Sequence, residues 1–107
     1  MNLPEPIPAY FAAANAFQAE AAAAHFTPDA HVHDENHDHV GREAVRAWIE
    51  DASHKYRPQI EVLSADTRGD EVMVTNRICG DFPGSPIEPR FTFAVSGDRI
   101  GSLEVAP

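Results

Sequence analysis

The chain has 107 residues, a formal net charge of −9 and a single cysteine, Cys79. That length suits one domain spanning residues 1–107, and a hydrophobic content of 43% suits a folded protein with its own core. The acidic balance disfavours nucleic acid and anionic membranes as partners, and no apolar run approaches the roughly 20 residues that cross a bilayer. A single cysteine rules out an internal disulfide and favours a cytoplasmic location.

Two segments carry apolar residues at helical spacing. The first follows an extended, proline-containing lead-in over residues 1–8 and continues, with one bend, through the alanines at 19–24 to end by Pro28. The second begins at Gly41, ends at Pro58 and has a clear apolar stripe. The stripe consists of Val45, Trp48, Ile49, Ala52 and Tyr56.

Strands are expected between and after these helices. A short one over residues 30–35 has His31 and His33 on one face and Val32 and Asp34 on the other. Beyond Pro58 the pattern alternates, and turn signals separate four more strands, over residues 59–65, 71–79, 90–95 and 100–105. Helices followed by hairpin-connected strands predict an α+β fold, in which a strongly curved antiparallel sheet packs on the N-terminal helices and leaves a conical pocket.

Three stretches carry a resemblance to a known family: FTPDAHVHD (26–34), GREAVRAW (41–48) and GDRI (97–100). In this order they resemble the helix-to-first-strand passage, the opening of the third helix and the final hairpin of the NTF2-like superfamily. Within it they are most similar to the SnoaL-like or ketosteroid-isomerase-like group. The resemblance implies an NTF2-like cone over nearly the whole chain. It leaves the activity open, because this fold hosts isomerases, cyclases, dehydratases, epoxide hydrolases and non-catalytic binders.

The resemblance also implies roles for two residues. The stretch YFAAANA (10–16) is similar to the first-helix segment of ketosteroid isomerase whose tyrosine donates a hydrogen bond to the enolate oxygen, which indicates Tyr10. Asp34 falls where that enzyme keeps its general-base aspartate. The place of its second oxyanion donor, a neutral carboxylic acid, falls near Glu88 and Pro89, and proline cannot do that work. We therefore expect the base and the phenol without the steroid reaction.

The chemistry of these residues supports the same roles. Proton abstraction beside a carbonyl needs a carboxylate in a partly dry cavity, and a phenol can polarise the carbonyl oxygen. Each has a plain alternative: Asp34 as a solvated loop acid, and Tyr10 as a packed ring with its hydroxyl in water. His37 or His39 could serve as a proton partner at the pocket mouth, since histidine titrates near neutrality. The predicted substrate contacts are Trp48, Phe82, Phe91, Phe93 and His39.

The stretch from Asp29 to Gly41 holds four of the six histidines, at positions 31, 33, 37 and 39. A His-x-His pair on a strand points two imidazoles the same way, and a third ligand would complete a zinc-like site. The alternation that aligns the imidazoles also turns Asp34 away from them, and histidines in an acidic, polar loop are commonly solvated. No metal ligand is therefore assigned.

Two further expectations concern the strands. Arg77 and Arg90 are expected to form cross-strand ion pairs, and Cys79 is expected to be a small buried or interface residue. The candidate partners of the arginines are Glu71, Asp81 and Glu88.

Apolar strand residues of both parities, such as Val72 and Met73, predict a homodimer in which one sheet face is covered by a second copy. The expected function is binding of a small, mostly apolar carbonyl compound, with cofactor-free acid–base chemistry of the isomerase, cyclase or dehydratase type. Two alternatives stay open: a non-catalytic ligand-binding or dimerisation module, and a histidine-ligated metalloprotein.

Overall fold

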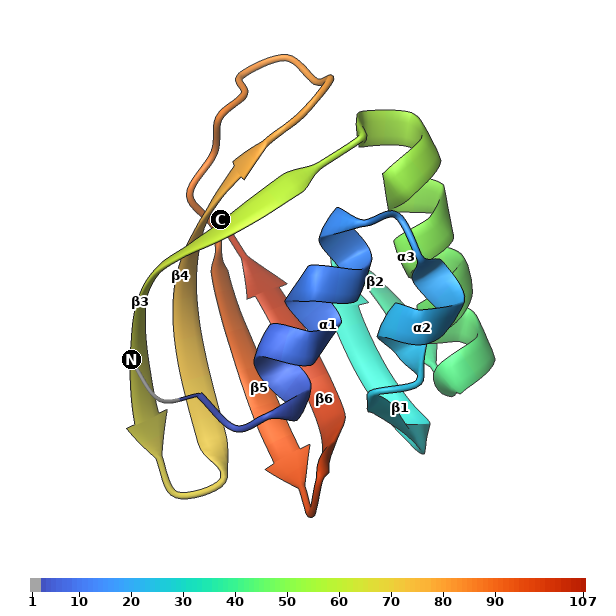
Figure 1. Ribbon diagram of the computed structural model, residues 1–107, viewed down its shortest axis with the longest axis vertical. Helices are drawn as coiled ribbons and strands as arrows, with labels where there is room; N and C mark the ends of the chain where they lie inside the picture. The colour runs from blue at the N-terminus through green and yellow to red at the C-terminus, as the bar shows by residue number, and fades with distance from the viewer. Residues whose placement is uncertain (1–2) are drawn as a thin grey trace.

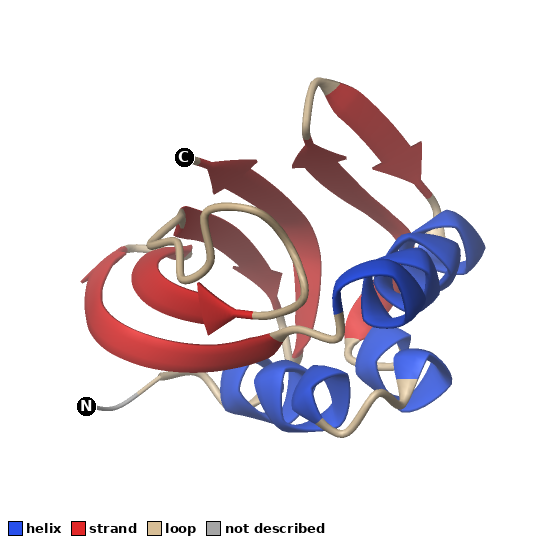
Figure 2. Cartoon of the chain, turned by 90° about the horizontal axis from the view of Figure 1, so that it is seen from above, coloured by secondary structure: helices blue, strands red, loops and turns tan. Residues whose placement is uncertain are grey.

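The computed structural model describes residues 3–107, which form three helices packed on one side of a six-stranded open sheet (Figure 1). Figure 2 shows that the sheet is strongly curved, so the expected α+β cone is confirmed. Within this described range, no helix has the length and apolar character needed to cross a membrane. In chain order the elements are α1 (Pro6–Asn15), α2 (Ala19–Ala23), β1 (Phe26–Asp34), β2 (His37–Val40), α3 (Arg42–Tyr56), β3 (Gln59–Arg68), β4 (Glu71–Cys79), β5 (Arg90–Ser96) and β6 (Arg99–Ala106).

The first helical segment begins earlier in the chain, and is more clearly divided, than expected. Helix α1 already begins at Pro6, which limits the extended lead-in, whose residues 1 and 2 lie outside the described range. The expected bend is a full break, because Phe17 adopts a left-handed backbone with φ of 59°. Asn15, at the end of α1, fixes this corner: its side-chain NH₂ donates to the Ile60 carbonyl at 2.9 Å, and its side-chain oxygen accepts from the Ile60 N–H at 2.8 Å.

Helix α3 is tied to strand β1 at its start. Gly41 precedes the helix with φ of 94°, a conformation that suits glycine, and its N–H donates to the Ala30 carbonyl at 2.7 Å. The Arg42 guanidinium then donates to the Phe26 carbonyl at 2.7 Å. These contacts hold the side chains of α3 opposite the inner face of β1.

The sheet has the order β2-β1-β6-β5-β4-β3. The four strands expected after Pro58 are confirmed, with modest extensions at their ends. One pairing departs from the expected antiparallel meander: β1 runs parallel to β6, with Val32 opposite Leu103. Strand β2 was not expected, since its residues are polar and largely exposed; it pairs with β1 through a two-residue turn at Glu35 and Asn36.

The core lies between the helices and the inner face of the sheet. Phe26 and Phe93 are fully buried there, and the Tyr10 ring packs edge-on against both, with ring centroids 5.3 and 6.1 Å apart. The most deeply buried polar side chain in this core is Asn76 on β4: it is 0% exposed, and its side-chain amide nitrogen and oxygen have no hydrogen-bond partner within residues 3–107. A buried amide without hydrogen-bond partners lowers the free energy of unfolding, so the contribution of Asn76 to stability does not explain its presence here.

The outer face of the sheet is more polar. Arg77 donates to Glu61 at 3.3 Å and to Glu88 at 3.4 Å, which confirms the expected pairing with Glu88. Cys79 is exposed, so the buried alternative for it is wrong; it lies at the end of β4 with outward parity.

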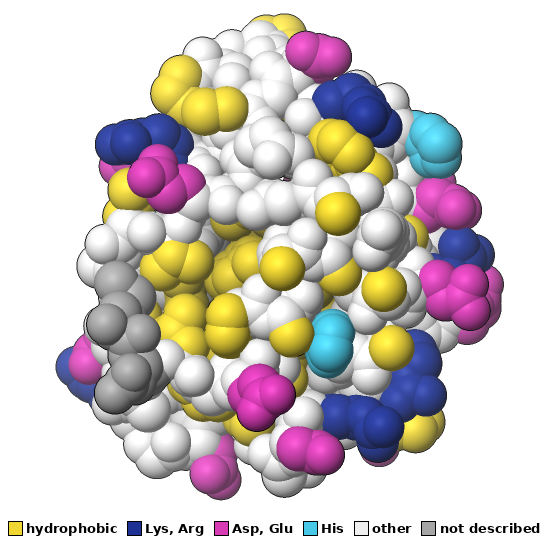
Figure 3. All heavy atoms as spheres, viewed as in Figure 1, with side chains coloured by type: hydrophobic (Ala, Val, Ile, Leu, Met, Phe, Trp, Pro, Cys, Tyr) yellow, Lys and Arg dark blue, Asp and Glu magenta, His cyan; other side chains and the backbone are white. Residues whose placement is uncertain are grey.

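The opposite face of the molecule, which carries the helices, is the one seen in Figure 3. On it, charged side chains lie mainly around the edge and hydrophobic atoms gather beside α1.

Candidate functional site

A cavity of about 430 Å³ lies between α1, α3 and the inner face of the sheet, beside the β4–β5 loop. Its wall is mostly apolar, with isoleucines from α3, β3, β4 and the β4–β5 loop. A volume of this size and an apolar lining are typical of small-molecule sites. Five aromatic residues line it: Tyr10, Trp48, Tyr56, Phe82 and Phe91.

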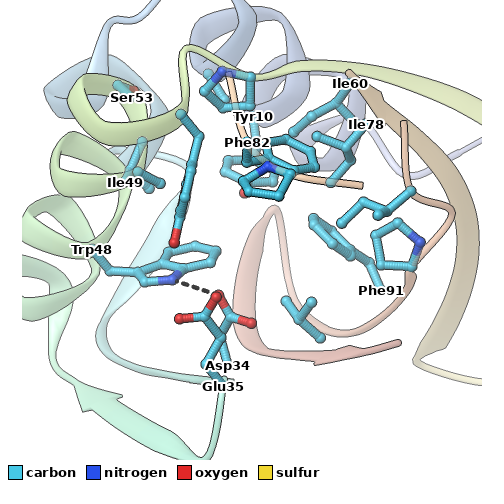
Figure 4. A pocket seen from close by; sticks show the side chains of 18 residues that line it. Tyr10, Asp34, Glu35, Trp48, Ile49, Ser53, Ile60, Ile78, Phe82 and Phe91 are labelled. Atoms are coloured by element: carbon cyan, nitrogen blue, oxygen red, sulfur yellow. Dashed lines mark hydrogen bonds between the residues drawn. The ribbon is translucent and has the colours of Figure 1, made fainter. Parts of the chain in front are cut away.

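Asp34 lies at the end of β1 with its carboxylate in the cavity (Figure 4). It shares strand parity with the buried Val32, which turns it inward as the sequence predicted. The Trp48 indole N–H donates to Asp34 Oδ2 at 3.0 Å. Because Trp48 comes from α3, this bond fixes the carboxylate between helix and strand. The other oxygen of Asp34 accepts no side-chain hydrogen bond from residues 3–107.

Tyr10 reaches the same cavity from α1, with 2% of its surface exposed. Burial raises the pKa of its hydroxyl strongly, and the nearby charge of Asp34 raises it further. The hydroxyl therefore stays protonated throughout the neutral range and can donate a hydrogen bond. The structure thus brings Tyr10 and Asp34, the two predicted catalytic residues, to one cavity.

Three of the five predicted substrate contacts, Trp48, Phe82 and Phe91, line the cavity. The other two lie elsewhere. Phe93 is 0% exposed and packs against Phe11 in the core, with ring centroids 5.7 Å apart. His39 lies 6.0 Å from the Trp48 ring, between ring centroids, but is not part of the cavity wall, because β2 runs along the edge of the sheet.

Sequence reasoning missed Glu35, whose side chain lines the cavity beside Asp34 (Figure 4). Glu35 and Asn36 have φ of 53° and 63° and form the turn between β1 and β2. Two-residue turns with positive φ at both positions favour asparagine, aspartate and glycine. The Asn36 in this turn was the available signal, because a tight turn directly after Asp34 keeps the next side chain close to it.

The β4–β5 loop, whose sequence indicates a turn and contains the predicted contact Phe82, forms another wall of the cavity through Phe82 and its neighbours. Its Asp81 N–H donates to the Tyr56 carbonyl at 2.7 Å, and the Phe82 ring packs edge-on against the Tyr56 ring at 5.6 Å. Gly80 permits this approach, since a Cβ there would lie 2.6 Å from the Tyr56 carbonyl oxygen. The loop is therefore held against the end of α3.

The histidines of β1 point to the opposite side of the sheet from Asp34. Asp38 on β2 accepts hydrogen bonds from His31 Nε2 and His33 Nδ1, both at 2.8 Å. The hydrogen bond to Asp38 is the main reason that the pKa of His33 is raised. Among residues 3–107, no group of three or more His, Cys, Asp or Glu side chains is arranged to hold a metal ion.

The SnoaL-like domain family matches residues 7–100 of the chain. The protein belongs to this SnoaL-like family. A candidate polyketide cyclase from Sinorhizobium meliloti is 33% identical, with a TM-score of 0.92 over 96% of this chain and 94% of the other. No curated protein matches the sequence.

Two more distant solved structures share the fold of this SnoaL-like protein. The epoxide hydrolase/cyclase-like enzyme SalBIII, which acts in pyran ring formation in polyether salinomycin, is 21% identical, with a TM-score of 0.82 over 95% of this chain and 87% of the other. A ketosteroid-isomerase-like protein from Catenulispora acidiphila, solved with trimethylamine, is 20% identical, with a TM-score of 0.87 over 99% and 87%. At these identities the likeness concerns the fold alone.

Proposed function

We propose that the cavity binds a small, mostly apolar carbonyl compound and that the protein catalyses a cofactor-free acid–base reaction on it. The observation that carries this proposal is the presence of the Asp34 carboxylate and the protonated Tyr10 hydroxyl in one aromatic cavity. The similarity to a candidate polyketide cyclase supports a reaction of the cyclase or isomerase type.

In this reaction the free oxygen of Asp34 takes a proton from the carbon next to the carbonyl. The C–H electron pair moves into the carbon framework, and the carbonyl oxygen gains negative charge. The Tyr10 hydroxyl donates to that oxygen, and this bond strengthens as the charge develops. The enolate then takes the proton back at another carbon, which is isomerisation. Alternatively it attacks a second carbonyl carbon of the same molecule, whose C=O π bond opens and whose oxygen takes the proton from Asp34, which is cyclisation.

The test is exchange of hydrogen for deuterium beside the carbonyl of apolar cyclic ketones in D₂O, followed by NMR. The wild-type protein should accelerate the exchange, and Asp34→Asn should slow it by about 100-fold or more, because a positioned base typically contributes that much. Asp98→Asn, in the exposed β5–β6 turn, is the matched control and should exchange like the wild type. Deuterium exchange at the wild-type rate in the Asp34→Asn variant would show that Asp34 is not the base.

A non-catalytic ligand-binding module is the second candidate function. The hydrogen bond from the Trp48 indole N–H supports this function. The bond holds one oxygen of Asp34 in a fixed position, which suits the binding of a ligand as well as catalysis. Saturable changes in Trp48 fluorescence, without deuterium exchange for any ketone in the panel, would favour this function over catalysis.

We also infer a homodimer formed through the outer face of the sheet. Figure 2 shows the helices on one side only, and Met73, Thr75 and Thr92 on the other side are only half-buried. Sedimentation equilibrium should give the mass of two chains, and Met73→Lys should lower it to one. A wild-type monomer at all concentrations would refute the dimer. A cytoplasmic location stays a prediction from the single cysteine.

A further inference from the structure

We propose that the ligand of this cavity carries a protonated amine and that the carboxylate of Glu35 is its counter-ion. The inference rests on the proposed binding of a small molecule and adds the charge of that molecule. It does not depend on whether Asp34 acts as a base.

The charge of the cavity wall is the first argument. The acidic side chains that line the cavity, Asp34 and Glu35, lie next to each other, and none of the lysines, arginines and histidines among residues 3–107 lines the wall. These two carboxyl groups are the acidic part of an otherwise mostly apolar wall. A ligand with a carboxylate or phosphate would be repelled there, whereas an ammonium group would be attracted.

The second argument is the difference between the two carboxylates. Asp34 accepts the hydrogen bond from Trp48, whereas Glu35 forms no hydrogen bond or ion pair with any residue of the described range 3–107. The left-handed backbone of Glu35 is costly for a residue of its type, and the turn places its carboxylate beside that of Asp34 in the cavity (Figure 4). Its carboxylate is free to meet a cation that enters.

The aromatic lining is the third argument. Trp48 lies next to Asp34, and Tyr56 and Phe82 line the same cavity, where their rings meet edge to face at 83°. Aromatic faces attract ammonium groups, and the attraction grows when water is excluded. A site with carboxylates and several aromatic faces therefore selects a cation over a neutral group of the same shape.

Lys55 is the basic residue that competes for Glu35. Its ammonium lies 5.1 Å from the Tyr56 ring centroid, outside the cavity wall. The pKa of Lys55 is raised, first by a hydrogen bond to Tyr56 and least by the charge of Glu35. Because Lys55 is exposed and forms no ion pair with Glu35, it does not neutralise the carboxylate.

The experiment compares three probes of the same shape at pH 7 by isothermal calorimetry: phenylbutylamine, phenylbutanol and phenylbutyrate. The amine should bind at least tenfold tighter than the alcohol, and the butyrate should bind most weakly. Glu35→Gln should weaken the amine about tenfold and leave the alcohol unchanged, since it removes one charge and keeps the shape. Glu35→Asn should do the same without backbone strain, because asparagine is favoured at this left-handed position.

The matched control is Glu71→Gln, which removes an exposed carboxylate from the start of β4 and should change no affinity. Equal or tighter binding of the alcohol or the butyrate would overturn the amine inference and leave the proposed small-molecule binding intact. Amine preference that survives both Glu35 variants would overturn the assignment of Glu35. Failure of all three probes to bind the folded protein would refute the small-molecule site itself.

Discussion

The inner face of the sheet has a packed half and a hollow half. In the packed half, buried side chains of β1, β5 and β6 pack against α1, and Phe26, Phe93 and Leu103 are at most 1% exposed. Toward α3 and the β4–β5 loop, apolar side chains of the same kind, such as Ile78 and Phe82, surround a cavity instead. The difference shows that an apolar strand pattern does not itself decide between core and binding site. The decision depends on whether a neighbouring element fills the space.

Asn76 lies on the inner face of β4, between Val74 in the packed half and Ile78 in the cavity wall. Its amide is fully buried but contributes no partnered hydrogen bond within residues 3–107. Hydrophobic packing therefore does not explain why a polar residue occupies this position.

The largest effect is expected from truncating one aromatic ring in each half. Phe93→Ala should lower the free energy of unfolding by about 3–5 kcal/mol, because it leaves a void in a filled core. Phe82→Ala should lower it by only about 1 kcal/mol, because the ring is partly exposed and lines a space that is already empty. Urea denaturation measures both, and equal losses would contradict the division into two halves.

A smaller effect, of opposite sign, is expected at the boundary. Asn76→Val should raise the free energy of unfolding by about 1 kcal/mol, since it removes a buried amide without partners. Asn15→Val is the matched control and should lower it by about 1–2 kcal/mol, because the Asn15 amide makes two hydrogen bonds with Ile60. Destabilisation by Asn76→Val would mean that the amide has a partner in solution.

A further effect is expected at the hydrogen bond from Trp48 to Asp34 in the hollow half. Trp48→Phe keeps an aromatic ring in the wall but removes the N–H that holds Asp34. We expect a loss of about 1 kcal/mol in the free energy of unfolding, together with slower deuterium exchange in the ketone assay. Unchanged exchange would show that the position of Asp34 does not depend on Trp48.

The smallest effect is expected on the outer face of β1. The hydrogen bond that His33 donates to Asp38 raises the pKa of His33 above its ordinary 6.5. The hydrogen bonds that Asp38 accepts from His33 and then His31 lower the pKa of Asp38 below its ordinary 3.8. The contribution of His33 to the free energy of unfolding is fully present below pH 6.5 and is lost as the pH rises through its raised pKa. The contribution of Asp38 is fully present above pH 3.8 and is lost as the pH falls through its lowered pKa.

The group of His31, His33 and Asp38 should therefore stabilise the fold most between pH 3.8 and 6.5, and only slightly, since all three side chains are exposed. NMR titration should show the pKa of His33 falling toward 6.5 in Asp38→Asn. High salt should reduce the difference between the two proteins. A His33 pKa that is the same in both would refute the interaction.

The fold was largely predictable because its signals are local. The stripe on α3 and the alternation after Pro58 need only the spacing of apolar residues along one element. The same alternation correctly turned Asp34 inward and His31 and His33 outward. These inferences concern faces of single elements.

The rest of the site depends on which elements meet, and spacing does not contain that information. Phe91 and Phe93 share one face of β5, yet Phe91 lines the cavity while Phe93 is enclosed by α1. Glu35 belongs to the site because a backbone turn with positive φ places it there. In the sequence, Glu35 is one of several polar residues in a polar stretch, and its spacing does not distinguish it from its neighbours.

The parallel pairing of β1 with β6 has a consequence for how the protein is made. Strand β1, which carries Asp34, is hydrogen-bonded on one side to β2 and on the other to β6, the last strand in the chain. A ribosome has to synthesise nearly seventy further residues after Asp34 before that second neighbour exists. Pairing at such sequence separation also slows folding, because a long loop has to close first. A nascent chain thus holds the Asp34 carboxylate on an incomplete sheet, and the cavity around it is complete only after translation has delivered β6, whose Val105 forms part of the wall.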